Sequence, residues 1–306
     1  MIAKLDDLAA LTVAKNRKTT VAVVEAHDGN TLEAVTQAVD DGIITPLLLG
    51  NREKIRQLLA AGNTDPDKYE ILHTCSRAES LALAVDCVHS GRVKALMKGS
   101  LESSDFLHAV TKRDNKLLSG AILSLTGLYE TPGYHKVFAV SDVAVNLYPD
   151  LNAKRAIIEN AVYMLWRLGL PQPKVAILSA VDKPNNKMPE TLDAEALKKM
   201  NSDGIITDCI IEGPISFDLA TSPDAVKAKG YSSPVAGDAD LLIVPNLATG
   251  NILVKCLTGM AGARTAGTVL GAKVPVILTS RSAEASDKYY SIALAALLGG
   301  AQQGRG

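Results

Sequence analysis

Short apolar segments that alternate with amphipathic ones are the feature that most constrains how this chain can fold. The apolar segments are rich in Val, Ile and Leu and show little polar alternation, which is typical of strands covered on both faces. They occupy residues 21–24, 44–49, 93–97, 137–140, 175–178, 205–211, 241–244 and 274–278. The sequence therefore predicts an α/β fold with mainly parallel sheets and helices on both faces.

Helices are predicted between several of these strands. Apolar residues recur at helical spacing over 31–41, 154–168 and 191–200, and a glycine that can end a helix lies shortly after each segment. The chain has 306 residues, which at about 150 residues per domain suggests two domains or one large one. Apolar continuity lapses at 141–149, so we place a domain junction there.

Composition and charge exclude several classes of protein. The 33 acidic and 32 basic residues nearly balance, and aromatic residues make up only 4% of the chain, so we expect no nucleic-acid partner. No apolar run approaches the length of about 18 residues that a membrane span needs. Charged residues also interrupt the N-terminal stretch, which argues against a signal peptide. We therefore expect a cytoplasmic protein without a membrane partner.

The 4 cysteines and 5 histidines show no metal-binding pattern. The cysteines lie far apart without a CxxC pair, which argues against a zinc ribbon and against a disulfide framework. The histidines form no metal-like pair, so we expect no metal site. Cys256 is predicted to be a buried core thiol.

Polar residues gather where the predicted strands end. Ligands of open parallel sheets bind beyond the carboxyl ends of the strands. Small, hydroxylated or charged residues stand at such ends at 98–100, 141–142, 179, 212–214, 245–246 and 279–281. Loop composition alone would explain any one of these, but together they predict a polar cleft.

Common nucleotide-binding and hydrolase motifs are missing from the sequence. Neither GxGxxG nor GxxxxGK[ST] occurs, and the glycine-rich stretch 259–267 has the wrong spacing for either. HExxH and GxSxG are missing as well. These observations argue against dinucleotide oxidoreduction, phosphate-loop hydrolysis, and the zinc-protease and serine-hydrolase templates.

Segment 278–287 is a candidate phosphate site. Arg281 follows a predicted strand and precedes the last helix, and a guanidinium group matches the geometry of a phosphate. Ser280 could add a hydrogen bond. In the alternative interpretation, Ser286 or Asp287 caps the helix and Arg281 forms a surface ion pair.

Segment 245–255 is a second candidate. Asn246, Gly250 and Asn251 could bring amide and backbone donors to an anion after a strand. Alternatively, 246–250 forms a tight turn and Asn251 is the N-cap of a helix.

These residues resemble the phosphate acetyltransferase and phosphate butyryltransferase family over nearly the whole chain. The resemblance rests on these segments and motifs, in chain order: 21–50, Lys98-Gly99 followed by Ser103-Ser104, 187–194, 212–218, 237–255, and Ser280-Arg281 with Asp287. The resemblance implies two α/β/α domains with an interdomain cleft, as in isocitrate and isopropylmalate dehydrogenases. It places residues 1–140 with about 283–306 in a discontinuous first domain and 141–282 in the second. It also implies a homodimer or higher homo-oligomer.

The resemblance further implies a reaction in which acyl-CoA and phosphate give acyl phosphate and coenzyme A, reversibly. Asp287 would be the general base on the coenzyme A thiol, Arg281 would hold the phosphoryl group, and Ser280 would hydrogen-bond the reacting centre. Coenzyme A is a substrate here, so no resident cofactor is implied. The residues expected to bind substrate are Lys98, Gly99, Ser103, Ser104, Asn246, Gly250, Asn251 and Lys255.

Alternatives remain both for the acyl group that is transferred and for the class of function. Segment 103–108 holds no arginine, unlike acetyl-type members, and the combination of Lys98-Gly99, Pro245-Asn246 and Lys255 is closer to the butyryl branch. A butyryl preference is therefore expected, with acetyl-CoA as the alternative. The other candidates are an NAD-dependent dehydrogenase of the isocitrate/isopropylmalate fold and a non-catalytic protein that binds acyl phosphate or coenzyme A.

Overall fold

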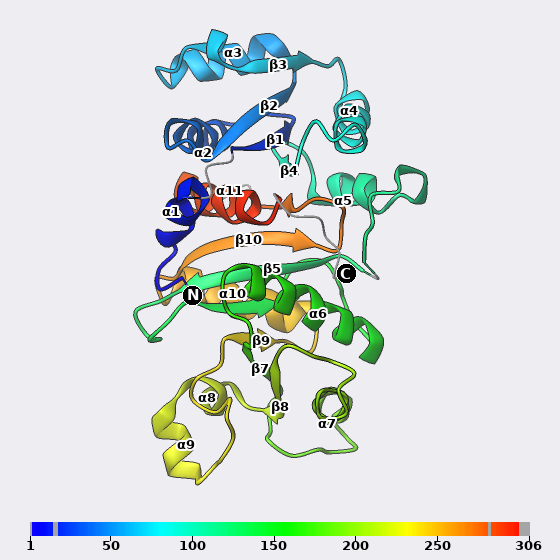
Figure 1. The fold of residues 1–306 in the computed structure, drawn as a ribbon, viewed down its shortest axis with the longest axis vertical. Helices are drawn as coiled ribbons and strands as arrows, with labels where there is room; N and C mark the ends of the chain where they lie inside the picture. Colours follow the sequence, from blue (N-terminus) through cyan, green and yellow to red (C-terminus); the bar gives the residue numbers. More distant parts are fainter. Residues whose placement is uncertain (1, 15–17, 121, 281–282, 300–306) are drawn as a thin grey trace. The chain divides into compact units, whose positions relative to one another are not determined.

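The computed structural model describes residues 2–14, 18–120, 122–280 and 283–299 (Figure 1). The chain divides into two compact units. Of the described residues, 5–14, 18–120, 266–280 and 283–299 form one unit, and 2–4 and 122–265 form the other. The first is called here the phosphate-side unit, because it contains most of the segment 278–287 predicted to bind phosphate, and the second the central unit, because it holds the middle of the sequence.

The phosphate-side unit has a mostly parallel sheet in the order β3-β2-β1-β4-β11-β10. Neighbouring strands are parallel from β3 to β11, and β11 is antiparallel to β10. Its strands are β1 (Thr19–Val24), β2 (Ile44–Gly50), β3 (Glu70–His73), β4 (Ala95–Lys98), most of β10 (Arg264–Leu270) and β11 (Val276–Ile277).

Helices cover both faces of this sheet. Helix α11 packs against α1, α2, β1 and β4, whereas α4 contacts β1, β2 and α5 (Figure 1). The helices are α1 (Asp7–Ala14), α2 (Gly29–Asp40), α3 (Arg52–Ala61), α4 (Arg77–His89), α5 (Ser103–Thr111) and α11 (Ala285–Gly299), with 3₁₀ turns η1 (Pro66–Lys68) and η2 (Arg113–Asn115).

The central unit has a sheet in the order β5-β6-β9-β7-β8, parallel except for the antiparallel pair β5 and β6. Its strands are β5 (Ser124–Glu130), β6 (Phe138–Ser141), β7 (Lys174–Leu178), β8 (Ile210–Ile215) and β9 (Leu241–Ile243). Its helices are α6 (Leu151–Arg167), α7 (Pro189–Ser202), α8 (Phe217–Thr221), α9 (Pro223–Lys229) and α10 (Leu247–Gly259).

The mixed α/β fold with mostly parallel sheets confirms the prediction, but three strands were missed. Strands β5 and β10 mix Ser, Thr and Gly with apolar residues, so neither forms a continuous apolar run. Strand β3 lies at a sheet edge and exposes Glu70 and His73. The strand predicted at 205–211 begins only at Ile210, because the side-chain amide of Asn201 holds the preceding turn by donating to the carbonyls of Ile206 and Cys209.

A buried carboxylate organises the polar segment 141–149. Oxygens of Asp142 accept hydrogen bonds from the backbone N–H groups of Leu125, Ala144, Val145 and Asn146, and from the side-chain amide of Asn146, at 2.6–3.2 Å. The segment is therefore tied to β5 inside the central unit. The chain passes from one compact unit to the other at 4/5, 120/121 and 265/266. The domain bounds predicted from the sequence, 1–140 with about 283–306 and 141–282, stay a prediction.

No helix among the residues that the structure describes has both the length and the apolar character needed to cross a membrane.

Replacing Asp142 by Asn should destabilise the central unit by about 2–3 kcal/mol, because the amide keeps only one acceptor and its NH₂ group faces other donors. Chemical unfolding of the two proteins measures the difference. Asp150→Asn is the matched control: Asp150 is the exposed N-cap of α6, where Asn caps about equally well, so the change should stay within about 0.5 kcal/mol. Equal stability of the wild type and Asp142→Asn would contradict this account.

Candidate functional site

The carboxyl ends of β4 and β11 form one wall of a small polar cavity. The two strands are parallel neighbours, so the residues that follow them emerge at the same edge of the sheet. A cavity of about 120 Å³ lies there. It is lined by Asp28, Thr31, Lys98, Gly99, Ser100, Thr279, Ser280 and Lys288, and is called here the phosphate-side cavity.

Gly99 lets the loop after β4 lie directly on the end of β1. A Cβ atom at this position would be 2.2 Å from the carbonyl oxygen of Glu25. In its absence, the N–H of Gly99 donates to Val24 and the N–H of Ser100 donates to Glu25, at 2.8 and 2.7 Å. The glycine is therefore needed for packing, and through it for the placement of Lys98 and Ser100.

Glu25 is itself held in an uncommon conformation at this junction. Its φ of 57° lies in the left-handed region, which costs free energy for a side chain other than glycine. Its buried carboxylate accepts from Ser80 Oγ, and its Oε2 lies 3.3 Å from Nδ1 of His27. Nε2 of His27 accepts the N–H of Asn51 at 2.7 Å, so the ring proton of the neutral imidazole faces Glu25. Burial lowers the pKa of His27, against the opposing effect of the Glu25 carboxylate.

Two buried lysines contribute to the phosphate-side cavity. Lys98 is only 4% exposed, and its ammonium donates to the carbonyls of Gly99 and Leu101. Lys288 is 2% exposed, and its Nζ lies 3.1 Å from both Oδ1 of Asp28 and Oγ1 of Thr31. Burial alone would raise the pKa of Asp28, but hydrogen bonds from Thr31 and Lys288 lower it below its ordinary value.

The structure describes two of the three predicted catalytic residues. Ser280 lines the phosphate-side cavity, whereas Arg281 lies outside the described residues. Asp287 is in the first turn of α11, next to Lys288 in the sequence. Because α11 begins at Ala285, Ser286 and Asp287 lie inside the helix, and the alternative in which one of them caps it is wrong.

Ser103 and Ser104 are exposed and begin helix α5. The described residues that line the phosphate-side cavity include neither of them. The structure therefore brings Lys98, Gly99 and Ser280 together in the lining of one cavity. The serine pair lies at the start of α5 instead.

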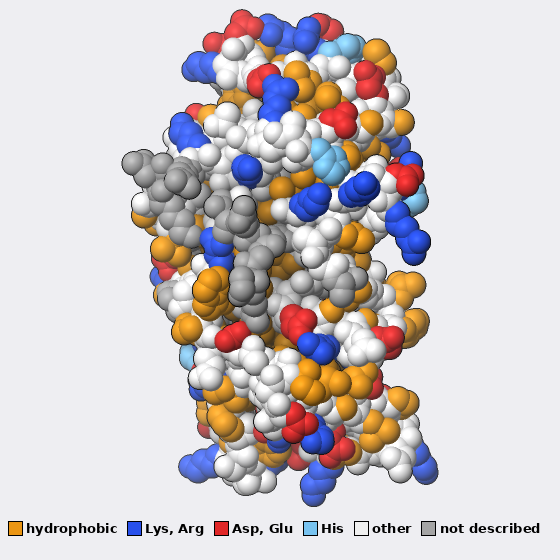
Figure 2. Space-filling view, turned by 45° about the vertical axis from the view of Figure 1, so that its right-hand side comes forward, with side chains coloured by type: hydrophobic (Ala, Val, Ile, Leu, Met, Phe, Trp, Pro, Cys, Tyr) orange, Lys and Arg blue, Asp and Glu red, His pale blue; other side chains and the backbone are white. Residues whose placement is uncertain are grey.

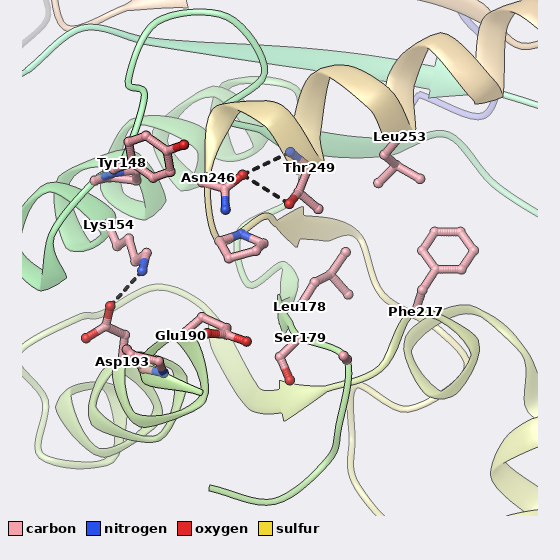
Figure 3. Close-up of a pocket in the computed structure, with 14 residues that line it drawn as sticks. Tyr148, Lys154, Leu178, Ser179, Glu190, Asp193, Phe217, Asn246, Thr249 and Leu253 are labelled. Carbon is pink, nitrogen blue, oxygen red and sulfur yellow. Dashed lines mark hydrogen bonds and ion pairs between the residues drawn. The ribbon is translucent and has the colours of Figure 1, made fainter. Parts of the chain in front are cut away.

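The central unit contains a larger cavity of about 640 Å³ at the carboxyl ends of β7, β8 and β9. Figure 3 shows Lys154 paired with Asp193 on one side of the cavity, and the side chains of Phe217 and Leu253 on the other. Lys154 is buried, and its ammonium lies 2.6 Å from the Asp193 carboxylate. Asn246, predicted as a binding residue, lines this cavity. The apolar lining suits the body of an organic ligand better than a small anion.

The predicted residues of segment 245–255 lie in helix α10 or at its N-cap. Asn246 is the N-cap, and its Oδ1 accepts from the N–H and the hydroxyl of Thr249 (Figure 3). Gly250 and Asn251 lie within the helix, so the alternative of a turn with Asn251 as the N-cap is wrong. A Cβ atom on Gly250 would be 2.7 Å from the carbonyl oxygen of Asp142, so this glycine permits close packing.

Lys255 is exposed on α10 and is not among the described residues that line the cavity of the central unit. The prediction for Cys256 was wrong: this thiol is exposed, because it lies on the outer side of α10. The described residues contain no group of three or more His, Cys, Asp or Glu side chains that could hold a metal ion.

The sequence analysis missed Asp28, Thr31 and Lys288. Asp28 follows β1 and is the N-cap of α2, so the same strand-end argument that selected Lys98 would have found it. No feature of the sequence pointed to Lys288, since it lies within a helix and its burial depends on the packing of α11 against α2.

Known proteins that resemble this chain cover nearly its whole length. A phosphate acetyltransferase of Rhizobium meliloti is 39% identical over 294 residues, which make up 96% of this chain and 93% of the relative. A phosphate butyryltransferase of Clostridium acetobutylicum is 37% identical over 280 residues, covering 92% of this chain and 93% of the relative.

A branched-chain phosphotransacylase from Enterococcus faecalis V583, known from its crystal structure, is 32% identical with a TM-score of 0.81. That comparison covers 91% of this chain and 98% of the other. The family model described as phosphate acetyl/butaryl transferase matches residues 9–82 and 70–296. The resemblance inferred from the motifs is confirmed, and the chain belongs to the phosphate acetyl/butaryl transferase family.

Proposed function

We propose that this protein is a cytoplasmic phosphate acyltransferase that moves a short-chain acyl group reversibly between coenzyme A and inorganic phosphate. Family membership supports the reaction. The single structural observation that carries it is the phosphate-side cavity, where the buried Lys98 at the end of β4 and Ser280 after β11 line the same space. An ammonium group and a hydroxyl at a small cavity suit a phosphoryl group.

The proposed reaction is a direct transfer within a ternary complex. Asp287 accepts the proton of the coenzyme A thiol, and the thiolate attacks the carbonyl carbon of the acyl phosphate. A carbon–sulfur bond forms as the bond to the phosphate oxygen breaks. Arg281 offsets the charge on the departing phosphate, and Ser280 donates a hydrogen bond to the reacting centre. Alignment of the two substrates supplies much of the rate, and no resident cofactor takes part.

The remaining predicted contacts to substrate stay predictions. Gly99 acts in this proposal through the position of the loop after β4. The other predicted substrate-binding residues are Ser103, Ser104, Asn246, Gly250, Asn251 and Lys255.

The proposal also includes a preference for the butyryl group over the acetyl group. It rests on the Lys98-Gly99, Pro245-Asn246 and Lys255 combination, and the similarity to a protein described as a branched-chain phosphotransacylase supports it. Acetyl-CoA is the alternative substrate, since the phosphate acetyltransferase of Rhizobium meliloti is also similar.

We also propose that the chain forms a homo-oligomer through the central unit. Hydrophobic side chains lie at the molecular surface among the charged ones (Figure 2). On α10, Ile252 is 63% exposed and Met260, just after the helix, is 87% exposed, with the exposed Cys256 between them at helical spacing. A second copy of the chain would cover this apolar face.

Phosphate added to the protein with acetyl-, propionyl- or butyryl-CoA should release free thiol, detected with a thiol reagent. We expect kcat/KM for butyryl-CoA to exceed that for acetyl-CoA by about tenfold or more, since the butyryl group has two more methylene groups and each is worth about 1–3 kcal/mol. A protein that only binds coenzyme A would release no thiol. Reduction of NAD by a hydroxy acid, with no thiol release, would support the dehydrogenase alternative instead.

Asp287→Asn should slow acyl transfer from acyl phosphate to coenzyme A most at low pH. A free thiol has a pKa of about 8.5, so spontaneous thiolate is scarce at pH 6 and becomes plentiful near pH 9. The ratio of wild-type to variant rate should therefore fall as the pH rises. Arg281→Ala should instead lower kcat by about 10²–10³ across this range, because the leaving phosphate carries charge throughout. Parallel pH profiles for wild type and Asp287→Asn would remove the base assignment.

Light scattering should give at least twice the mass of one chain. Ile252→Lys places a charge on the apolar face of α10 and should shift the protein towards the monomer. Val13→Lys is the matched control, because Val13 is half-exposed on α1, in the other unit. A wild-type protein that stays monomeric at micromolar concentration would contradict the proposal.

A further inference from the structure

Lys288 is a buried cation whose position is unfavourable for its own helix. It is the fourth residue of α11, so its ammonium lies near the positive end of that helix dipole. Its partner Thr31 lies in the first turn of α2, whose N-terminus is likewise positive. Helix stability therefore does not explain why a lysine occupies this position, close to two helix N-termini.

The hydrogen bonds of Lys288 leave one donor for a ligand. An ammonium group has three N–H donors. Among the described residues, its acceptors are Oδ1 of Asp28 and Oγ1 of Thr31, both at 3.1 Å. Lys288 also lines the phosphate-side cavity, so its third donor is available to a molecule bound there.

The surroundings of this cavity favour an anion. Of the charged side chains that the structure describes in its lining, Lys98 and Lys288 are cationic and only Asp28 is anionic. Both ammonium groups are almost fully buried, so charge-assisted hydrogen bonds to a ligand would be little weakened by water. The hydroxyl groups of Thr279 and Ser280 add neutral donors.

We propose that Lys288 is a phosphate-binding residue of the phosphate-side cavity, and that Asp28 and Thr31 are positioning residues that hold its ammonium towards the ligand. This inference rests on the proposed function for the identity of the ligand, which is inorganic phosphate or the phosphoryl group of an acyl phosphate. Asp28 lies 3.1 Å from the Lys288 ammonium and holds it in place in the absence of a ligand.

The test compares equilibrium binding of inorganic phosphate alone, by calorimetry, in the wild type, Lys288→Met and Lys288→Arg. We expect Lys288→Met to raise the Kd for phosphate about 10- to 100-fold, as the loss of a hydrogen bond to a charged group would. The Kd for coenzyme A should change by less than about twofold. Lys288→Arg keeps the charge and should recover part of the phosphate affinity. Lys273→Met, which removes an exposed lysine of the same unit, should leave both constants unchanged.

A double variant separates binding from a merely structural role. Lys288→Met leaves Asp28 without its charged partner and can therefore destabilise the unit. Asp28→Asn combined with Lys288→Met removes both charges, so it should regain thermal stability without regaining phosphate affinity. If the double variant binds phosphate as the wild type does, Lys288 only neutralises Asp28 and the inference is wrong.

The experiment distinguishes a failure of this site from a failure of the proposed function. Wild-type protein that binds phosphate through Lys288 but releases no thiol from acyl-CoA would overturn the acyltransferase proposal and leave this site intact. Normal acyl transfer with an unchanged KM for phosphate in Lys288→Met would overturn the site and leave the acyltransferase intact.

Discussion

The close approach of the loop after β4 to the end of β1 is the constraint on which the phosphate-side unit depends. Gly99 permits it, because any Cβ atom there would meet the Glu25 carbonyl. The backbone hydrogen bonds from Gly99 and Ser100 then fix the loop at this edge. Lys98, at the end of β4, is buried as a result, and the residues after β11 complete the same edge. The wall of the cavity formed by the loop after β4 thus depends on one contact between two backbones.

The two units use the same architecture for different chemistry. In each, a cavity lies beyond the carboxyl ends of parallel strands. The phosphate-side cavity is small and is lined by two buried ammonium groups and several hydroxyl groups. The cavity of the central unit is larger and lined mainly by apolar side chains such as Leu178, Phe217 and Leu253. Position in the fold therefore locates a site, whereas the side chains decide what it can bind.

Much of the fold could be predicted because the buried parallel strands have a simple apolar signature. The strands that lacked it, β5 and β10, take part in antiparallel pairs and contain threonine and glycine. Lys98, Gly99 and Ser280 were found because a strand-end rule applies to them. Lys288 could not be found in this way, since its burial comes from helix packing. Cys256 shows the reverse error: an apolar helix segment was taken to be buried, but its outer side is exposed.

The segment held by Asp142 lacks regular secondary structure, yet its backbone N–H groups are hydrogen-bonded. Its backbone N–H groups at 144, 145 and 146 all bind one buried carboxylate, together with that of Leu125 from β5. Amide hydrogens exchange with solvent only when such bonds open. In this loop a single side chain provides the protection that a strand obtains from its neighbour. We therefore expect these hydrogens to exchange together, in one cooperative opening, at a rate closer to that of the sheet than to that of a surface turn.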